Sequence, residues 1–483
     1  MITMTYYMIA GALVLLLCIG FSKLLYRFGL PSLLIFIVLG MLAGSDGIGG
    51  VYFDDYALAQ ALSSIALIFI MFFGGFSTNW KAAKPVAVPA ILLSSLGTAL
   101  TALLTGLFCH FVLHFPLLES LLLGSVVAST DAASVFSILR SRKLNLKGGL
   151  ASLLEIESGS NDPFAFMLTV IVLTMMAGKD ASGSFLLLLQ QIGFGLLIGG
   201  LLGLGAIWLL RRVRFEVEAF YPLFVAAVAV LCYALCDAVG GNGFLCVYIA
   251  GILLGNSKIP HTRNLVHFFD GVSWLMQILL FFALGLLAFP SRLPAVAWPS
   301  ILISLFMIFV ARPATVFAIL SWFKVPVRQQ LLVSWVGIRG AASIVFAIYA
   351  VTDSAALQTD VFHIIFFIVL FSVLVQGTLM PTVAKKLNLV EKETSVLKTF
   401  NDYQDESYME LAEMKLSKHH PWCGRALMDI ELPDDILVVL IQRGKESVVP
   451  RGSTILHPGD TLVLNGADEE ALRSLSSSKT SAP

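Results

Sequence analysis

Five polar or ionisable side chains stand within eight residues of an apolar stretch: Glu155, Glu157, Ser158, Asn161 and Asp162. On a helix, Glu157 and Asn161 lie four residues apart, as do Ser158 and Asp162, so each pair shares a face. An ionisable group inside a bilayer costs at least about 2.5 kcal/mol, and such groups mark ion pathways and proton relays. The cluster therefore predicts a site that binds a cation or a proton. A buried structural hydrogen-bond network is the alternative, and it applies most to Glu155.

A second apolar stretch, residues 125–139, contains Ser129, Thr130 and Asp131. Monovalent cations are bound in proteins by oxygen atoms, and a locally unwound helix would add backbone carbonyls to these side chains. We therefore predict that Thr130 and Asp131 face the ion from an interrupted helix. The alternative is that Asp131 only caps a helix near its cytoplasmic end.

A third apolar stretch contains Arg339, which is flanked by Gly337 and Gly340. Glycines on both sides favour a break in the helix. A buried arginine needs a carboxylate partner or the carbonyl end of a helix. A structural role, such as a salt bridge to Glu157, and direct handling of the substrate both remain open. The candidate carboxylates are those of Asp131, Glu157 and Asp162.

Other polar residues in apolar stretches are weaker candidates. Arg312 precedes Pro313, and we expect this pair to shape its helix rather than join the site. His363 and Gln376 are expected to pack or hydrogen-bond near the end of the apolar region. His110 is expected at the membrane interface, where it would not act as a pH sensor.

The composition indicates what must position these residues. Of 483 residues, 58% are hydrophobic and 13% are charged, whereas a soluble domain carries about 25% charged residues. The mean hydropathy is +0.88, which excludes a disordered protein, a fibrous protein and an ordinary cytosolic enzyme. No basic tract suggests a nucleic acid. No nucleophile–base pair, phosphate loop or cysteine framework indicates an enzyme, a cofactor, a disulfide or a bound transition metal.

Thirteen segments are apolar enough to be read as membrane helices, although the second and the ninth are short. They are 4–25, 29–45, 56–77, 86–112, 116–139, 148–177, 184–210, 217–239, 242–256, 265–289, 295–321, 327–351 and 360–384.

The loops between these segments predict their orientation. Cytoplasmic loops are enriched in Lys and Arg. With the N-terminus outside, the inner loops hold 17 Lys and Arg and the outer loops hold two. We therefore expect an outside N-terminus and a cytoplasmic C-terminus.

Thirteen segments also permit six helices, a linker helix and six more, which would place the two halves in opposite orientations. Inverted repeats of this type are common in secondary transporters. In this scheme the fifth and twelfth segments are repeat mates, and both carry a break signal and a charge. The seventh segment would be the linker, and its glycines at 195, 199 and 203 permit close helix packing.

Three of these motifs resemble those of NhaP-type monovalent cation/proton antiporters. They are Thr130-Asp131, the run from Glu157 to Pro163, and the run from Gly337 to Ala342. The longer strings STDAASVFSILR and LEIESGSNDPFAF resemble the bacterial potassium/proton branch of that family. The resemblance covers residues 1–388. It implies an all-α polytopic membrane protein with 13 transmembrane helices, inverted repeats and crossed broken helices, the NhaA/NhaP-like antiporter fold.

The resemblance also implies roles for the site residues. Asp162 would bind the ion and the proton, and the hydroxyl and carboxylate groups of Thr130, Asp131 and Ser158 would help bind the cation. Asn161 and Glu157 would organise the site, with Glu157 facing Arg339. Relatives that carry two adjacent aspartates are electrogenic, so the neutral Asn161 implies electroneutral exchange. The family implies a homodimer in the lipid bilayer, in which a six-helix core domain moves like an elevator.

The last part of the chain changes character. Residues 1–384 form the predicted transmembrane domain, 385–407 a charged linker, 408–473 a small α+β cytoplasmic domain, and 474–483 a disordered tail. We expect strands at 408–416, 436–442 and 461–464 and short helices at 424–430 and 468–472. The strings HPWCGRALMDIELPDDILVVLIQRG and VVPRGSTILHPGDTLVLNG resemble the TrkA-C module. The module implies dimerisation and control by a small cytoplasmic ligand or nucleotide; a passive dimer clamp is the alternative.

Together these patterns predict a secondary antiporter that exchanges potassium for protons across the bacterial inner membrane. Sodium is the alternative cation, because oxygen ligands bind both ions. A ligand-gated cation channel is a rival hypothesis, but the sequence has no selectivity-filter string of the TVGYG type. A membrane receptor with inert helices is a third, and the buried charges argue against it.

Overall fold

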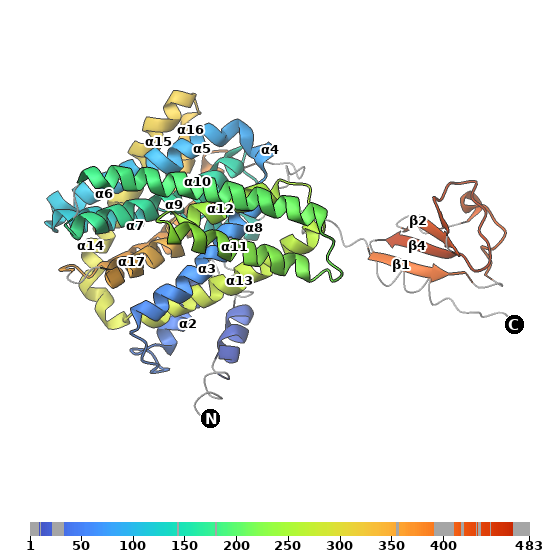
Figure 1. Cartoon of the computed structure of the whole chain (residues 1–483), viewed down its shortest axis with the longest axis horizontal. Coiled ribbons are helices and arrows are strands. Elements are labelled where there is room, and N and C mark those ends of the chain that lie inside the picture. The colour runs from blue at the N-terminus through green and yellow to red at the C-terminus, as the bar shows by residue number, and fades with distance from the viewer. Residues whose placement is uncertain are drawn as a thin grey trace. The chain divides into compact units, whose positions relative to one another are not determined.

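The computed structural model divides the chain into two units, Met1–Phe400 and Asn401–Pro483. The first unit is helical and the second contains a small sheet (Figure 1). The residues that the structure describes are 9, 11–21, 33–142, 144–178, 181–353, 357–390, 410–416, 420–430, 432, 436–444 and 446–466.

Nine of the described helices are long and apolar enough to cross a membrane. Four further apolar helices are shorter: Gly11–Phe21, Leu33–Ala43, Gly243–Gly255 and Ala341–Asp353. Each of these nine and four helices overlaps one of the thirteen predicted segments, although Ala341–Asp353 covers only the second part of the segment at 327–351. Length and composition thus support nine spans among the described residues, and the predicted total of 13 transmembrane helices stays a prediction.

The helices of the first half include one unbroken helix of 27 residues, which carries the cluster around Asp162. They are α2 (Leu33–Ala43), α3 (Tyr56–Ser77), α4 (Trp80–Ala83), α5 (Ala87–Leu92), α6 (Thr98–Leu113), α7 (Leu117–Val127), α8 (Ala132–Ser141), α9 (Leu150–Met176) and α10 (Ala181–Arg212).

The helices of the second half are interrupted more often, partly by proline. Pro313 has no N–H to donate to the carbonyl four residues earlier, and that carbonyl lies in a π-helical turn, Met307–Ala311. The helices are α11 (Phe220–Ala238), α12 (Gly243–Gly255), α13 (Thr262–Leu287), α14 (Leu293–Phe306), α15 (Arg312–Leu320), α16 (Val327–Trp335), α17 (Ala341–Asp353), α18 (Val361–Ser372) and α19 (Thr378–Lys386).

The helices pack as two groups. The first group is α2, α3 and α10–α13, and the second is α5–α9 and α14–α19. Within the first group, backbones touch at glycines: a Cβ on Gly255 would lie 1.9 Å from the Phe76 carbonyl oxygen, and one on Gly199 would lie 2.6 Å from that of Cys246. The predicted close packing along the seventh segment, now α10, is therefore confirmed. The two groups meet where α17 lies against α3 and where α9 lies against α10 and α12.

The second unit contains an antiparallel sheet of four strands in the order β1-β4-β2-β3. The strands are β1 (Glu410–Lys415), β2 (Ile436–Arg443), β3 (Glu446–Val448) and β4 (Thr461–Gly466). Three of them match the predicted strands, whereas β3 is too short to give a pattern. A 3₁₀ turn, Leu427–Asp429, lies in the predicted helix at 424–430. The predicted helix at 468–472 and the tail at 474–483 lie outside the described residues.

The segment that leads to the second unit is tied to the helical unit. Helix α19 continues to Lys386, two residues into the predicted linker at 385–407. The Lys147 N–H then donates to the Leu389 carbonyl at 2.9 Å, and Leu146 pairs with Val390 as an isolated antiparallel bridge. This fastens the end of the helical unit to the loop between α8 and α9. Residues 391–407 lie outside the described residues.

Candidate ion-binding site

The two predicted helix breaks are present, and they touch. The first break separates α7 from α8, and the second separates α16 from α17. The Asp131 N–H donates to the Ile338 carbonyl at 2.7 Å, which joins the two breaks directly. A Cβ added to Gly340 would lie 2.4 Å from the Cβ of Asp131, so glycine is required there for the breaks to approach. The breaks leave helix-end N–H and C=O groups without intrahelical partners.

Arg339 lies in the second break and is directed at the end of α7. Its Nη1 donates to the carbonyls of Ala128 at 2.8 Å and Ser129 at 2.7 Å, and its backbone N–H donates to the Ser372 hydroxyl at 3.0 Å. The guanidinium is buried. A positive charge at the carbonyl end of a helix is favourable because the helix dipole is negative there. Of the two kinds of partner considered for Arg339, the described part of the chain supplies the carbonyl end of a helix and not a carboxylate.

The partner of Glu157 is Arg312. The expectation that Glu157 faces Arg339 and the expectation that Arg312 stays outside the site were therefore both wrong. Glu157 Oε1 accepts from Arg312 Nη2 at 2.9 Å, with 1% and 3% of the two side chains exposed. Glu157 is not the hydrogen-bond partner of Arg339, whose guanidinium donates to the Ala128 and Ser129 carbonyls just after α7. Arg312 is not merely a helix-shaping residue, since α15 begins with it and places it opposite α9. Its burial in the eleventh segment was the signal that could have found it.

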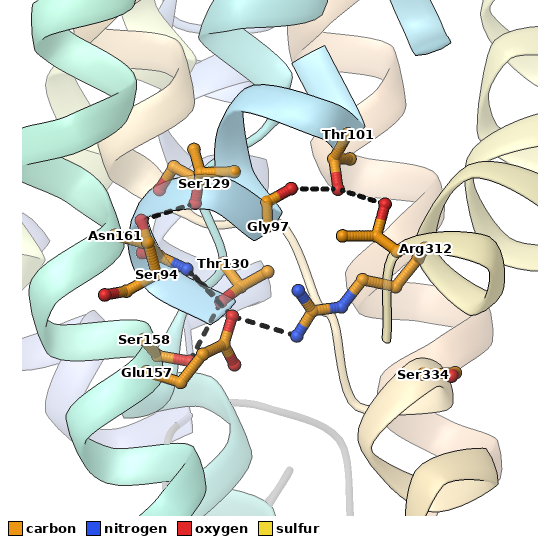
Figure 2. A network of polar contacts seen from close by, with 12 residues as sticks. Ser94, Gly97, Thr101, Ser129, Thr130, Glu157, Ser158, Asn161, Arg312 and Ser334 are labelled. Atoms are coloured by element: carbon orange, nitrogen blue, oxygen red, sulfur yellow. Dashed lines mark hydrogen bonds and ion pairs between the residues drawn. The ribbon is translucent and has the colours of Figure 1, made fainter. Parts of the chain in front are cut away.

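Asn161 links this ion pair to the first break through a chain of polar contacts. Its Nδ2 donates to Thr130 Oγ1 at 2.5 Å and lies 3.4 Å from Glu157 Oε1. The hydroxyls of Thr130 and Ser158 are 2.9 Å apart. Figure 2 shows Thr130 between Asn161 and Ser158, and Glu157 directed at Arg312. The arrangement places Thr130, Asn161, Glu157 and Ser158 in one network. The shared helix face predicted the contact between Glu157 and Asn161, whereas Ser158 contacts Thr130.

Asp162 lies beside this network, at a cavity of about 40 Å³. Its Oδ1 accepts a hydrogen bond from the Ser129 hydroxyl. The cavity is also lined by Thr130 and Asp131. A water molecule needs roughly 10–15 Å³ of such space, so the cavity has room for a monovalent cation with water. Carboxylate and hydroxyl oxygens on one small cavity are suited to an ion that sheds part of its hydration shell.

Asp131 both caps a helix and lines the ion cavity. Its Oδ1 accepts from the Ala133 N–H at 2.9 Å and its Oδ2 from the Ser134 hydroxyl at 2.5 Å, which caps the start of α8. The hydrogen bonds of Asp131 are therefore those of a helix-capping residue. The same carboxylate also lines the cavity with Asp162, so capping and ion contact are compatible.

The cavity has a second wall that sequence reasoning did not include in the site. Helices α3 and α13 of the first group contribute Leu67, Gln277 and Phe281 to the lining. Gln277 Nε2 donates to the Ser273 hydroxyl at 3.1 Å. The sequence signal that could have identified Gln277 as a cavity residue was a single amide side chain in an otherwise apolar segment. The cavity thus lies between the two helix groups.

Further hydrogen bonds hold the second break in place. Gln376 Nε2 donates to the Trp335 carbonyl at 2.9 Å, and the Ser372 hydroxyl donates to Gln376 Oε1 at 2.5 Å. Gln376 is thus a hydrogen-bonding residue, as expected. His363 Nδ1 lies 2.8 Å from Asp360 Oδ1, and its Nε2 accepts from the Phe289 N–H at 3.3 Å.

Two family models match the sequence. The model described as sodium/hydrogen exchanger, transmembrane, matches residues 12–386, and that of the TrkA-C domain matches residues 411–476.

Several curated proteins are similar along most of the chain. The K(+)/H(+) antiporter NhaP2 of Shewanella sp. (strain MR-4) is 36% identical over 99% of this chain and 84% of the relative. The K(+)/H(+) antiporter NhaP of Alkalimonas amylolytica is 35% identical over 91% of this chain and 77% of the relative. The Na(+)/H(+) antiporter ApNhaP of Aphanothece halophytica is 26% identical over 75% and 70%.

A solved structure has the same fold. The sodium proton antiporter MjNhaP1 from Methanocaldococcus jannaschii, at pH 8, aligns with a TM-score of 0.71 at 24% identity. The alignment covers 80% of this chain and 99% of the archaeal chain. The helical unit therefore has an NhaP-like antiporter fold.

Proposed function

This chain belongs to the sodium/hydrogen exchanger family, and on that basis we propose that it exchanges potassium for protons at Asp162. It is a multi-pass membrane antiporter for a monovalent cation and protons, with a C-terminal TrkA-C domain. Potassium is proposed because relatives at 35–36% identity are named K(+)/H(+) antiporters. Sodium is the second candidate, since the relative from Aphanothece halophytica is named a Na(+)/H(+) antiporter.

The observation that carries the proposal is the setting of Asp162. Its carboxylate lines a small cavity and has one hydrogen-bond donor, Ser129, with no ion pair among the described residues. A carboxylate in this setting binds either one proton or one monovalent cation. The two occupants exclude each other, and this competition couples their opposite movements.

The neighbouring charges support electroneutral exchange. Asn161 is neutral, and Glu157 is neutralised by Arg312. If Asp162 carries one proton in one direction and one monovalent cation in the other, the moving group has the same net charge both ways. A membrane voltage then does no net work on a complete cycle.

The position of the cavity supports alternating access by movement of one helix group against the other. Asp162 and the helix breaks belong to the second group, whereas Leu67 and Gln277 belong to the first. Sliding the second group along the first would carry the site across the membrane, which is the elevator-type mechanism. A homodimer formed through the first group would hold that group still.

The remaining expectations are part of the same proposal. Basic residues in alternate loops support an outside N-terminus and a cytoplasmic TrkA-C domain in a bacterial inner membrane. That domain is proposed to bind a small cytoplasmic ligand or nucleotide. The proposed division of the chain is a transmembrane domain at 1–384, a linker at 385–407, the TrkA-C domain at 408–473 and a tail at 474–483. No resident cofactor is proposed; the cation and the proton are the substrates.

Purified full-length protein in sealed vesicles with an internal pH dye tests the proposal. Potassium and sodium are added in turn, with the membrane voltage clamped or free. We expect a potassium-driven pH change that is independent of voltage and lost in Asp162→Asn. Asp353→Asn, which changes an exposed carboxylate at the end of α17, is the matched control and should transport normally.

Other outcomes would contradict specific parts. A response to sodium alone would remove the potassium assignment. A voltage-dependent response would contradict electroneutrality and require a second titrating group, with Asp131 first. Normal exchange in Asp162→Asn would contradict the site itself, and cation flux without proton exchange would favour a channel.

A further inference from the structure

Three hydroxyl groups form a chain across the boundary between the two helix groups. Tyr349 of α17, in the second group, lies 3.0 Å from the Ser64 hydroxyl of α3 and 3.1 Å from the Tyr233 hydroxyl of α11, both in the first group. Ser64 in turn donates to the Gln60 carbonyl at 2.7 Å.

The direction of these bonds follows from the number of protons. Each hydroxyl has one proton to donate. Ser64 uses its proton on the Gln60 carbonyl, so its oxygen accepts from Tyr349. Tyr349 has then spent its own proton, so its oxygen accepts from Tyr233. The chain therefore runs one way, and Tyr349 is the member whose loss breaks both bonds that cross the boundary.

Aromatic rings from both groups surround the chain. Phe166 of α9 and Tyr349 have ring centroids 5.2 Å apart, and Phe244 of α12 lies 5.1 Å from Phe166 and 5.0 Å from Tyr233. Phe346 of α17 lies 5.4 Å from Phe166. The two tyrosines are half-buried by these rings, and hydrogen bonds are stronger where a side chain is shielded from water.

The chain lies to one side of the ion cavity. Ala341 lines the cavity, and Tyr349 is eight residues further along α17, roughly 12 Å at the rise of an α-helix. On α3, Leu67 lines the cavity and Ser64 is one turn nearer the start of that helix. Tyr349 and Ser64 are displaced from the cavity toward the same side of the membrane unit, because their hydroxyls lie 3.0 Å apart. Under the proposed topology this is the outer end.

We propose that the Tyr233–Tyr349–Ser64 chain is a latch that closes the ion cavity on its outer side and opens in every transport cycle. The inference rests on the proposed alternating access. Movement of α17 relative to α3 and α11 must break both bonds to Tyr349, so the latch sets the balance between the inward-open and outward-open forms.

The test compares the apparent KM for potassium on the two sides of oriented vesicles. The apparent affinity on each side scales with the fraction of protein open to it, so the ratio of outer to inner KM reports the balance directly. One hydrogen bond corresponds to about a fivefold change. We expect Tyr349→Phe, which loses both crossing bonds, to lower the ratio about fivefold or more. Ser64→Ala and Tyr233→Phe should each lower it less, because one of the two crossing bonds survives in each variant.

Tyr221→Phe is the matched control. The Tyr221 hydroxyl accepts from the Phe215 N–H at 3.3 Å within the first group, so its removal should leave the ratio unchanged. An unchanged ratio of outer to inner KM in both Tyr349→Phe and Ser64→Ala would overturn the latch. Equal changes of KM on the two sides would also overturn it, even if thermal stability changed.

Hydrogen exchange separates failure of the latch from failure of the proposed function. If wild-type protein exchanges no cation for protons, the proposed function fails. The latch still predicts faster amide exchange at 341–353 and 56–66 in Tyr349→Phe than in wild type or Tyr221→Phe. Equal exchange in all three proteins would overturn the latch independently of transport.

Discussion

At the scale of single residues, the structure separates two carboxylates that are five positions apart, one buried and one half-buried at a cavity. Glu157 is held by Arg312, whereas Asp162 has a hydroxyl donor and an open cavity. The first arrangement fixes a charge permanently, and the second leaves a charge free to exchange its partner. The chemistry therefore belongs to Asp162, while the pair on the other side of Asn161 holds the network in place.

Replacing Arg312 tests the structural half of this division. Arg312→Met leaves the Glu157 carboxylate buried without its cation, which costs about 3–5 kcal/mol in comparable cases. We expect a large loss of thermal stability in detergent-solubilised protein. Adding Glu157→Gln should restore much of it, because the uncompensated charge is gone. Equal stability of the single and double variants would contradict the pairing.

Asp131→Asn tests whether this residue does more than cap α8. Asparagine keeps a side-chain oxygen that accepts from the Ala133 N–H, but it removes the negative charge beside the cavity. We expect thermal stability close to wild type and an apparent KM for potassium raised roughly tenfold, as expected for losing a charged ligand. A wild-type KM in the vesicle assay would restrict Asp131 to capping.

At the scale of elements, the site exists because two interrupted helices meet at their breaks. The Asp131 N–H to Ile338 carbonyl bond and the Arg339 contacts with the α7 carbonyls satisfy groups that a break leaves open. The breaks can approach this closely because Gly340 has no side chain.

Gly340→Ala should therefore strongly slow transport. The added methyl group would lie 2.4 Å from the Asp131 Cβ, and backbone must move to accommodate it. We expect the initial rate of potassium-driven proton movement to fall at least roughly tenfold. Gly200→Ala on α10, where a methyl group meets nothing within 4 Å, is the control and should transport normally. Normal transport by the Gly340 variant would exclude a close approach of the breaks.

The sheet of the second unit has its own pH-sensitive contact. The Arg443 guanidinium, with help from the His457 N–H, holds the pKa of buried Asp460 below its usual value. Because the folded-state pKa is the lower one, this stabilisation is complete above the usual pKa of about 4 and is lost as pH falls through the lowered value.

We expect protection against amide exchange in β2 and β4 to fall with pH below about 4 in wild type. Asp460→Asn should have weaker protection at neutral pH and a flatter pH profile, since it has no proton to take up. Intrinsic exchange rates at each pH supply the correction. Parallel profiles in the two proteins would show that the Arg443–Asp460 contact does not stabilise the folded sheet.

At the scale of the whole molecule, the ion cavity lies at the boundary of two helix groups, and so does the hydroxyl latch. An ion in the cavity would touch both groups, and movement at the boundary would change its access. Binding at such a place should stabilise the folded protein by mass action.

Potassium should therefore raise the thermal unfolding temperature of the intact protein, and protons should compete with it. Where Asp162 is largely protonated, each unit of lower pH should raise the potassium concentration needed for a given stabilisation up to tenfold. Asp162→Asn should remove both the stabilisation and its pH dependence. Choline at the same ionic strength is the control. Potassium stabilisation that does not vary with pH would contradict competition at Asp162.

The sequence predicted much of this fold because the membrane imposes strong local rules. Apolar length marks helices, and a charge between glycines marks a break, as Arg339 did with Gly337 and Gly340. It did not predict which arginine meets Glu157. Two buried arginines were available, and residues that are 155 positions apart along the chain leave no local pattern that decides between them. The short strand β3 was missed for the related reason that three residues carry no period.

By itself, then, the sequence determined the class of molecule, the apolar helical segments and the three polar motifs within them, because a charged residue in an apolar segment is informative at each position. Only the tertiary structure decided the partners: Arg312 for Glu157, the α7 carbonyls for Arg339, Ser129 for Asp162, and Gln277 on the opposite wall of the cavity. Hydrogen bonds and ion pairs depend on distance and direction within a few tenths of an ångström. Those are fixed when the helices pack, and the order of residues along the chain does not record them.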